Sequence, residues 1–211
     1  MVNELLIGRG ITDQRVIDIM RRLPRHIFLD PESGPQAYSD HAFPIGFSQT
    51  MSQPFMVAYL TECLQLKGDE VILEVGTGSG YQAAVLAELA CAVYSVERIP
   101  ELAAKASATL RELKVTNVHV KADDGRTGWS EKSPFDRILL TAAASEVPKT
   151  LLNQLKEGGI FVGPVIANEK SQQIVRLQKQ GSNFTVQRLR ECAFVPLLRG
   201  VFTNGGEERV R

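Results

Sequence analysis

The sequence has 211 residues, with 24 Lys or Arg and 24 Asp or Glu, so its formal net charge is zero. This length suits one domain with a sizeable core, and the lack of a basic excess argues against nucleic acid or a membrane surface as a partner. No apolar run approaches membrane-spanning length, and the first residues lack a charged-then-apolar signal. The three cysteines lie in apolar segments and predict reduced core residues rather than disulfides or a metal site. We therefore expect a soluble, cytoplasmic protein.

The first 65 residues predict a segment of helices and loops ahead of a sheet. Apolar residues at helical spacing indicate a helix over 11–23, which Thr12 or Asp13 could cap. Residues 41–54 (HAFPIGFSQTMSQP) follow neither a helical nor a strand pattern. Their final proline suits the first turn of the next helix, where its missing N–H costs nothing.

Residues 71–97 (VILEVGTGSGYQAAVLAELACAVYSVE) predict the unit around which the chain is organised. A short apolar strand leads into a turn that contains Gly76, Gly78 and Gly80, and then into an alanine-rich helix. A second apolar strand follows and ends at Glu97. Strand, glycine-rich turn, helix and strand in this order are typical of the first βαβ unit of a nucleotide-binding sheet.

The spacing of the glycines, G-x-G-x-G, differs from the G-x-G-x-x-G of pyrophosphate-binding loops. Glu74 would repel a pyrophosphate but would suit an ammonium group, and Glu97 is placed to accept hydrogen bonds from both ribose hydroxyls. S-adenosylmethionine (AdoMet) offers an ammonium group, a ribose and an adenine without a phosphate. The alternative is an ordinary glycine-rich turn with two surface glutamates. The pattern favours AdoMet, with the cofactor-binding residues Glu74, Gly76, Thr77, Gly78, Ser79, Gly80, Glu97 and Arg98.

The rest of the chain continues to alternate between helix and strand. The expected elements are a helix over 100–114, strands over 118–121 and 135–141, a helix over 148–156, a strand over 160–165, and a hairpin over 172–198 with a GSN turn. This order predicts a mostly parallel sheet with one antiparallel strand at its edge.

Ligands of such a sheet lie beyond the carboxyl ends of its strands. Asp124, after the third strand, could accept the adenine amino hydrogens, with the Gly125 N–H offered to a ring nitrogen; an ordinary turn is the alternative. The fourth strand is followed by Thr141 and three alanines rather than by the Asn/Asp-Pro-Pro-aromatic turn of many base and amine methyltransferases. A carboxylate acceptor fits better, because a carboxyl with a pKa near ~4 is already ionised and needs no general base.

Several motifs resemble those of the protein-L-isoaspartate (D-aspartate) O-methyltransferase family. They keep their order and spacing from about residue 11 to residue 198, and the QTMSQP segment is more specific to this family than the glycine motif. The matching segments are AYSD (37–40), PIG (44–46), QTMSQP (49–54), LEVGTGSGYQAAVLA (73–87), DGRTGW (124–129), PFD (134–136), TAAA (141–144), GG (158–159) and FVPL (194–197).

The resemblance implies a Rossmann-like class I AdoMet-dependent fold of the α/β class. Its mostly parallel, seven-stranded sheet would end in a C-terminal antiparallel hairpin, with helices on both faces. One methyltransferase domain would cover 1–211, with the active-site motif in 1–65 and the AdoMet-binding core in 71–211.

The implied activity is methylation of the α-carboxyl of L-isoaspartyl and D-aspartyl residues in damaged proteins, which starts repair through a succinimide. The enzyme would act as a monomer. By resemblance, Ser52 is the active-site residue, and Gln49 and Thr50 line the methyl-transfer region. The substrate peptide would contact Ser52 and the main chain of Phe194, Val195 and Pro196.

Ser52 could hold the acceptor carboxylate with its hydroxyl, or it could simply help to satisfy the N-terminus of the next helix. Two positions depart from the family pattern: Ser48 stands where glycine is usual, and Asp123 replaces the first glycine of Gly-Asp-Gly. Two other functions stay open at this point. One is AdoMet-dependent methylation of another acceptor, and the other is AdoMet binding without catalysis.

Overall fold

A computed structural model gives the fold and describes residues 1–203. Residues 204–211, which belong to the expected domain, lie outside the described part of the chain. The helices are α1 (Gln14–Arg22), α2 (Pro54–Cys63), α3 (Tyr81–Ala87), α4 (Pro100–Glu112) and α5 (Lys149–Asn153). The strands are β1 (Phe43–Gly46), β2 (Gln49–Met51), β3 (Val71–Val75), β4 (Ala92–Glu97), β5 (Val118–Ala122), β6 (Phe135–Leu140), β7 (Leu155–Asn168), β8 (Ser171–Gln180) and β9 (Asn183–Cys192).

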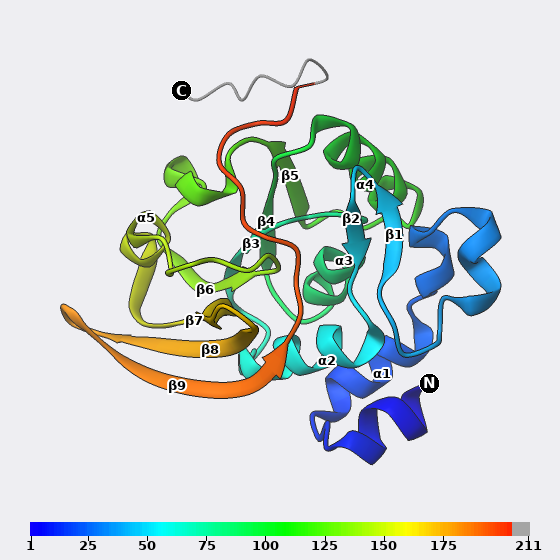
Figure 1. The fold of residues 1–211 in the computed structure, drawn as a ribbon, viewed down its shortest axis with the longest axis horizontal. Helices are drawn as coiled ribbons and strands as arrows, with labels where there is room; N and C mark the ends of the chain where they lie inside the picture. Colours follow the sequence, from blue (N-terminus) through cyan, green and yellow to red (C-terminus); the bar gives the residue numbers. More distant parts are fainter. Residues whose placement is uncertain (204–211) are drawn as a thin grey trace.

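Seven of these strands form one sheet in the order β5-β4-β3-β6-β7-β8-β9 (Figure 1). The five strands from β5 to β7 run parallel, whereas β8 and β9 are antiparallel to their neighbours. The predicted seven-stranded, mostly parallel sheet with a C-terminal antiparallel hairpin is therefore confirmed. The chain moves outward from β3 to β4 and β5, and then returns to place β6 on the other side of β3. This reversal puts the switch in strand order, where such sheets bind ligands, at the carboxyl end of β3.

The sheet separates two apolar clusters, because successive side chains of a strand point to opposite faces. Ile72 and Val93 pack with the helices α1 to α4, whereas Leu73 and Val96 pack on the opposite face with Leu151 of α5. All five side chains are almost completely buried. Strands buried on both faces explain the near-continuous apolar runs of the sequence.

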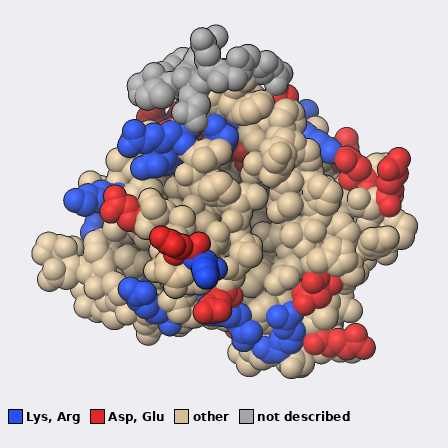
Figure 2. Space-filling view, viewed as in Figure 1, with Lys and Arg blue, Asp and Glu red and all other residues tan. Residues whose placement is uncertain are grey.

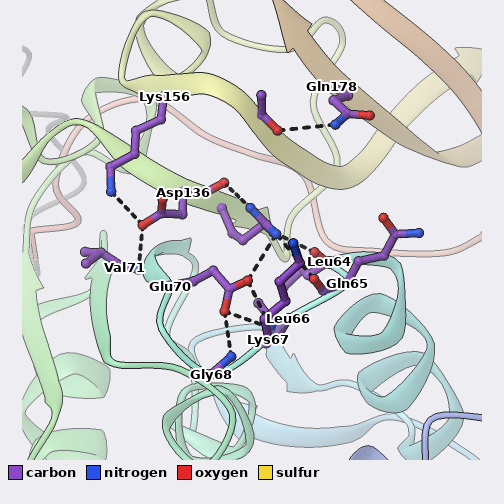
Figure 3. Close-up of polar contacts among 12 residues, drawn as sticks. Leu64, Gln65, Leu66, Lys67, Gly68, Glu70, Val71, Asp136, Lys156 and Gln178 are labelled. Carbon is purple, nitrogen blue, oxygen red and sulfur yellow. Dashed lines mark hydrogen bonds and ion pairs between the residues drawn. The ribbon is translucent and has the colours of Figure 1, made fainter.

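A polar network fixes the amino ends of β3 and β6, away from the switch point (Figure 3). The Glu70 carboxylate accepts the N–H groups of Lys67 and Gly68, at distances between 2.9 and 3.0 Å, and lies 3.1 Å from an Arg137 nitrogen. The Asp136 carboxylate accepts the Val71 N–H at 2.9 Å. These contacts fix the entry of the chain into the central strand.

Two predictions about elements were wrong. Residues 43–51, which follow no strand pattern in the sequence, form the hairpin β1–β2 outside the main sheet. The predicted hairpin over 172–198 is present as β8–β9, but its last strand ends at Cys192, before the FVPL segment. Charged side chains of both signs are interspersed over the face drawn in Figure 2. Within residues 1–203, no helix has both the length and the apolar character needed to cross a bilayer.

Candidate cofactor and acceptor site

The glycine loop that follows β3 brings the main chain close to the end of β6. Gly76, Gly78 and Gly80 all have positive φ, at 102°, 53° and 89°. A Cβ on Gly76 would lie 2.3 Å from the Thr141 Oγ1, too close for any side chain. That hydroxyl lies 2.7 Å from the Gly76 carbonyl oxygen and 3.0 Å from the Val75 carbonyl oxygen, which ties the loop to β6. The glycines are therefore required both by backbone conformation and by space.

Glu97, at the end of β4, has a carboxylate held by the main chain. Its two oxygens accept the N–H groups of Gly78 at 2.8 Å and of Ile99 at 3.0 Å. Burial raises its pKa, and these main-chain hydrogen bonds oppose that shift. A carboxylate has about four acceptor positions, so a fixed Glu97 can accept two further hydrogen bonds from neighbouring hydroxyls.

Glu74 lies below the loop rather than on the wall of a cavity. Its carboxyl is completely buried, accepts the Ser95 hydroxyl at one oxygen, and has no hydrogen-bond partner at the other, Oε1. Burial raises its pKa to about 8, the Ser95 hydrogen bond lowers it, and the nearby Glu97 charge raises it. The orphaned oxygen is a group that a cation could satisfy. The sequence predicts that Glu74 contacts the cofactor. In the structure its side chain is buried beneath the loop and does not border the cavity.

A cavity opens at the carboxyl ends of β3, β4 and β6. Its walls combine residues from six separate stretches of the chain: Gln49, Thr50, Val75, Gly76, Gly78, Val96, Glu97, Arg98, Gly125, Thr141, Ala142, Val195, Pro196, Leu197 and Leu198. Thr77 and Ser79 border a neighbouring hollow instead. The structure thus brings most of the predicted cofactor residues together.

Three residues predicted to bind the cofactor hold the main chain of the protein in place. The Asp124 carboxylate accepts the N–H groups of Arg126 and Gly200, both at 2.9 Å, and only its neighbour Gly125 borders the cavity. Gly80 precedes α3 as its N-cap. The Arg98 guanidinium donates to the carbonyls of Arg199 and Gly200, both at 3.2 Å. The spare acceptor positions of Asp124 are the ones that an adenine amino group could use.

A second cavity, of about 790 Å³, adjoins the first. Thr50 and Thr141 border both cavities, and Ser52 borders the second one, together with Phe194 and Val195. From the sequence, residues 141–145 were expected among the groups at the strand ends, but Thr141 was given no specific role. The two threonines mark where a group in one cavity would meet a group in the other.

Ser52 lies in the short connection between β2 and α2 and is half-buried. The N-cap of α2 is Gln53, and no side chain caps this helix. Among residues 1–203, the Ser52 hydroxyl has no hydrogen-bond partner, so it does not serve the helix N-terminus. It is free to bind a group in the second cavity.

The segment 193–203 closes the first cavity from outside, and Figure 1 shows it in red running from the end of β9 toward β5. The Ala143 N–H donates to the Val195 carbonyl at 2.7 Å, and the Leu197 N–H donates to the Ala143 carbonyl at 2.8 Å. Further along, the Phe202 N–H donates to the Arg98 carbonyl at 2.8 Å. The loops after β4, β5 and β6 are therefore all bound to this one segment.

Comparison with known proteins assigns this geometry to one group of enzymes. The family model described as protein-L-isoaspartate(D-aspartate) O-methyltransferase (PCMT) matches residues 1–201. A protein-L-isoaspartate O-methyltransferase of Dictyoglomus turgidum is 48% identical over 194 residues, which are 92% of this chain and 88% of that protein. A second such protein, from Geotalea uraniireducens, is 50% identical over 210 residues, covering 99% and 95%.

Solved structures agree with the sequence comparison. A protein-L-isoaspartate O-methyltransferase superposes with a TM-score of 0.82 at 29% identity over 93% of this chain, which spans 65% of that structure's chain. A Plasmodium falciparum structure described as a putative enzyme of the same kind, in complex with S-adenosyl-L-homocysteine, gives a TM-score of 0.79 at 25% identity. That match covers 93% of this chain and 96% of the other.

Proposed function

This chain belongs to the protein-L-isoaspartate(D-aspartate) O-methyltransferase family, and we propose that it methylates the α-carboxyl of L-isoaspartyl and D-aspartyl residues in damaged proteins. It has the class I fold of AdoMet-dependent enzymes, and AdoMet is its cofactor. Methylation would activate the carboxyl for succinimide formation and so begin repair. The observation that carries this proposal is the unpartnered Ser52 hydroxyl beside Thr50 and Thr141, where the two cavities meet.

The residues of the first cavity fit AdoMet. Glu97 offers free acceptor positions for the ribose hydroxyls, and Gly76 and Gly78 let the main chain approach a ligand without a Cβ in the way. Glu74 lies beneath that loop, with one oxygen that has no partner within residues 1–203, and a positive charge bound nearby would favour its ionised form. Arg98 is occupied with main-chain carbonyls, so it is not displayed for a phosphate. Bound AdoMet supplies an electrophilic methyl group on a sulfonium.

In the second cavity, the Ser52 hydroxyl would donate to one oxygen of the acceptor carboxylate. The other oxygen is then left to face the first cavity between Thr50 and Thr141. A carboxylate is a sufficient nucleophile when it is held in line, so orientation replaces a general base. The substrate main chain would lie along Phe194, Val195 and Pro196, whose segment already pairs with Ala143.

The cellular setting follows from less specific observations. All three cysteines are free thiols, and the chain has no net charge, which supports a cytoplasmic protein that needs neither nucleic acid nor a membrane. We propose that residues 1–211 form a single methyltransferase domain that acts as a monomer. In that domain, the part before residue 65 supplies Ser52 and the part after residue 71 supplies the cofactor site.

The test compares methyl transfer from labelled AdoMet to two synthetic peptides that differ only in one isoaspartyl or aspartyl linkage. We expect a base-labile methyl ester on the isoaspartyl peptide alone. Ser52→Ala should lower kcat roughly 10- to 100-fold, the effect of losing one hydrogen bond to a charged group. The control Ser130→Ala, in an exposed turn, should change nothing.

Three results would count against the proposal. AdoMet binding with no transfer to either peptide would point to a binding protein. Transfer to another acceptor only would point to a different methyltransferase. Full activity of Ser52→Ala would remove the role proposed for this hydroxyl.

A further inference from the structure

Arg25 is a completely buried arginine at the start of η3 (Arg25–Phe28). Among the described residues it has no ion pair with a carboxylate. Burial lowers the pKa of its guanidinium to about 10. Burying an unpaired charge destabilises the folded state by a free energy on the order of several kcal/mol. The residue therefore calls for an explanation other than stability.

The contacts of Arg25 join three stretches of chain that surround the proposed site. Its Nε donates to the Ala37 carbonyl at 2.8 Å, and its Nη2 donates to the Ser52 carbonyl at 2.5 Å. The guanidinium carbon lies 4.9 Å from the centre of the Tyr81 ring, and Tyr81 is the first residue of α3 after the glycine loop. Its third nitrogen, Nη1, is buried and has no hydrogen-bond partner within residues 1–203.

We propose that Arg25 is a positioning residue that fixes the main chain at Ser52, and thereby aims the Ser52 hydroxyl into the acceptor cavity. This inference rests on the role proposed for Ser52. The hydroxyl has no hydrogen bond of its own within residues 1–203, so the position from which it can reach the acceptor cavity is set by the main chain that carries it. Arg25 is the donor that the structure provides for the carbonyl of that residue.

Lysine cannot replace this function, although it would keep the charge. A guanidinium is a rigid planar fork that can hold two carbonyls at fixed positions, whereas an ammonium is a single point at the end of a flexible stem. Arg25→Lys should therefore loosen Ser52 or Ala37 without removing the positive charge. Misplacement of a reacting group by about 1 Å can lower a rate 100-fold.

The experiment is a double-mutant cycle of wild type, Arg25→Lys, Ser52→Ala and the double variant, with kcat and KM for the isoaspartyl peptide and the Kd for S-adenosyl-L-homocysteine. We expect Arg25→Lys to lower kcat about 10-fold or more, and to leave the Kd within about twofold. In the Ser52→Ala background the same substitution should lower kcat by less than about twofold, because its target is already absent.

Arg137→Lys is the matched control. Arg137 also donates to main-chain carbonyls, those of Leu64, Gln65 and Asp136, but it lies in the network at the amino ends of the strands and pairs with Glu70. We expect it to lower the melting temperature with kcat unchanged. If Arg25→Lys does not fold, Tyr81→Leu removes the ring beneath the guanidinium, and its loss of kcat should likewise disappear in the Ser52→Ala background.

Equal losses of kcat from Arg25→Lys in both backgrounds would overturn this inference, and so would an unchanged kcat. Neither result would affect the proposed function, which requires only that wild type methylates the isoaspartyl peptide. A wild type that fails to do so would remove the proposed function instead.

Discussion

At the scale of single residues, Glu74 makes the stability of the folded protein depend on pH. Its folded pKa of about 8 lies above its ordinary value of 4.5, because the carboxyl is buried. The protonated form is therefore favoured by folding. The resulting stabilisation is complete below pH 4.5 and disappears as the pH rises through 8, by a total on the order of a few kcal/mol.

Glu74→Gln should remove most of this dependence. We expect the free energy of unfolding of wild type to fall between pH 4.5 and pH 8. The free energy of unfolding of the variant should change less over this range, and above pH 8 it should exceed that of wild type. Denaturant titrations at a series of pH values measure both curves. Glu97 has a raised pKa in both proteins, so a shallow slope should remain. Two parallel curves would show that Glu74 is not the buried acid.

Sequence reasoning placed residues at the cavity where the signal is local, and their binding roles stay predictions. Glu97 follows directly from the end of its strand, and Gly76 follows from its loop, so both could be assigned without a structure. The depth of Glu74 could not be predicted, since it depends on the strands β4 and β6 that flank it and on the Ser95 hydroxyl of β4. Arg25 gave no signal at all, because its partners are main-chain carbonyls that no sequence pattern marks.

At the scale of elements, the β1–β2 hairpin carries backbone strain at its turn. Phe47 and Ser48 both have positive φ, at 53° and 55°, as a type I′ turn requires. Residues with a Cβ adopt this conformation at a cost of roughly 1 kcal/mol. Ser48, which stands where the family usually has glycine, is therefore tolerated rather than favoured.

Ser48→Gly should raise the free energy of unfolding by about 1 kcal/mol, because glycine adopts positive φ freely. Thermal melts of this variant and of Ser48→Ala, which keeps the Cβ, make the comparison. We expect an increase in melting temperature for the glycine variant only. Equal shifts in the two variants would mean that the serine hydroxyl, and not the backbone, decides the stability.

The same hairpin shows why its strands were not predicted. Gln49 to Met51 make only three residues of strand, too few for a period of two to be visible. The long β7, by contrast, was predicted only over its buried centre, because its exposed carboxyl end is defined by antiparallel pairing with β8 and its amino end by pairing with β6. The sequence predicted the bounds of strands that are buried on both faces closely. It did not predict the bounds of strands that are set by hydrogen bonding to a neighbouring strand.

At the scale of the whole molecule, the cofactor should bind the glycine loop, β4 and the segment 193–203 together. Saturation at 100 times the Kd of S-adenosyl-L-homocysteine stabilises the folded state by about 2.7 kcal/mol. We expect hydrogen exchange to slow at the amides of residues 76–80 and at Leu197 and Gly200. The β8–β9 hairpin, which does not border the first cavity, is the internal control. Protection of the glycine loop without protection of Leu197 would show that the last segment does not cover the ligand.

The alternation of strands and helices was sufficient to predict this architecture, because each apolar run must be buried on both faces of one sheet. It could not predict that residues 193–203 would return across three loops at the carboxyl end. That return depends on main-chain pairing with Ala143, and on a contact between the Phe47 and Phe202 rings, whose centres are 5.7 Å apart.

The position of this segment also sets when the enzyme can first become active during its synthesis. The ribosome makes residues 193–203 after all nine strands, yet they supply part of the cavity wall and bind the loops of β4, β5 and β6. A nascent chain can therefore assemble its sheet while its cofactor site is still open on one side. Termination just after Cys192 would keep all the strands of the sheet but remove the cavity wall formed by residues 195–198, and we expect such a chain to hold its methyl donor less tightly.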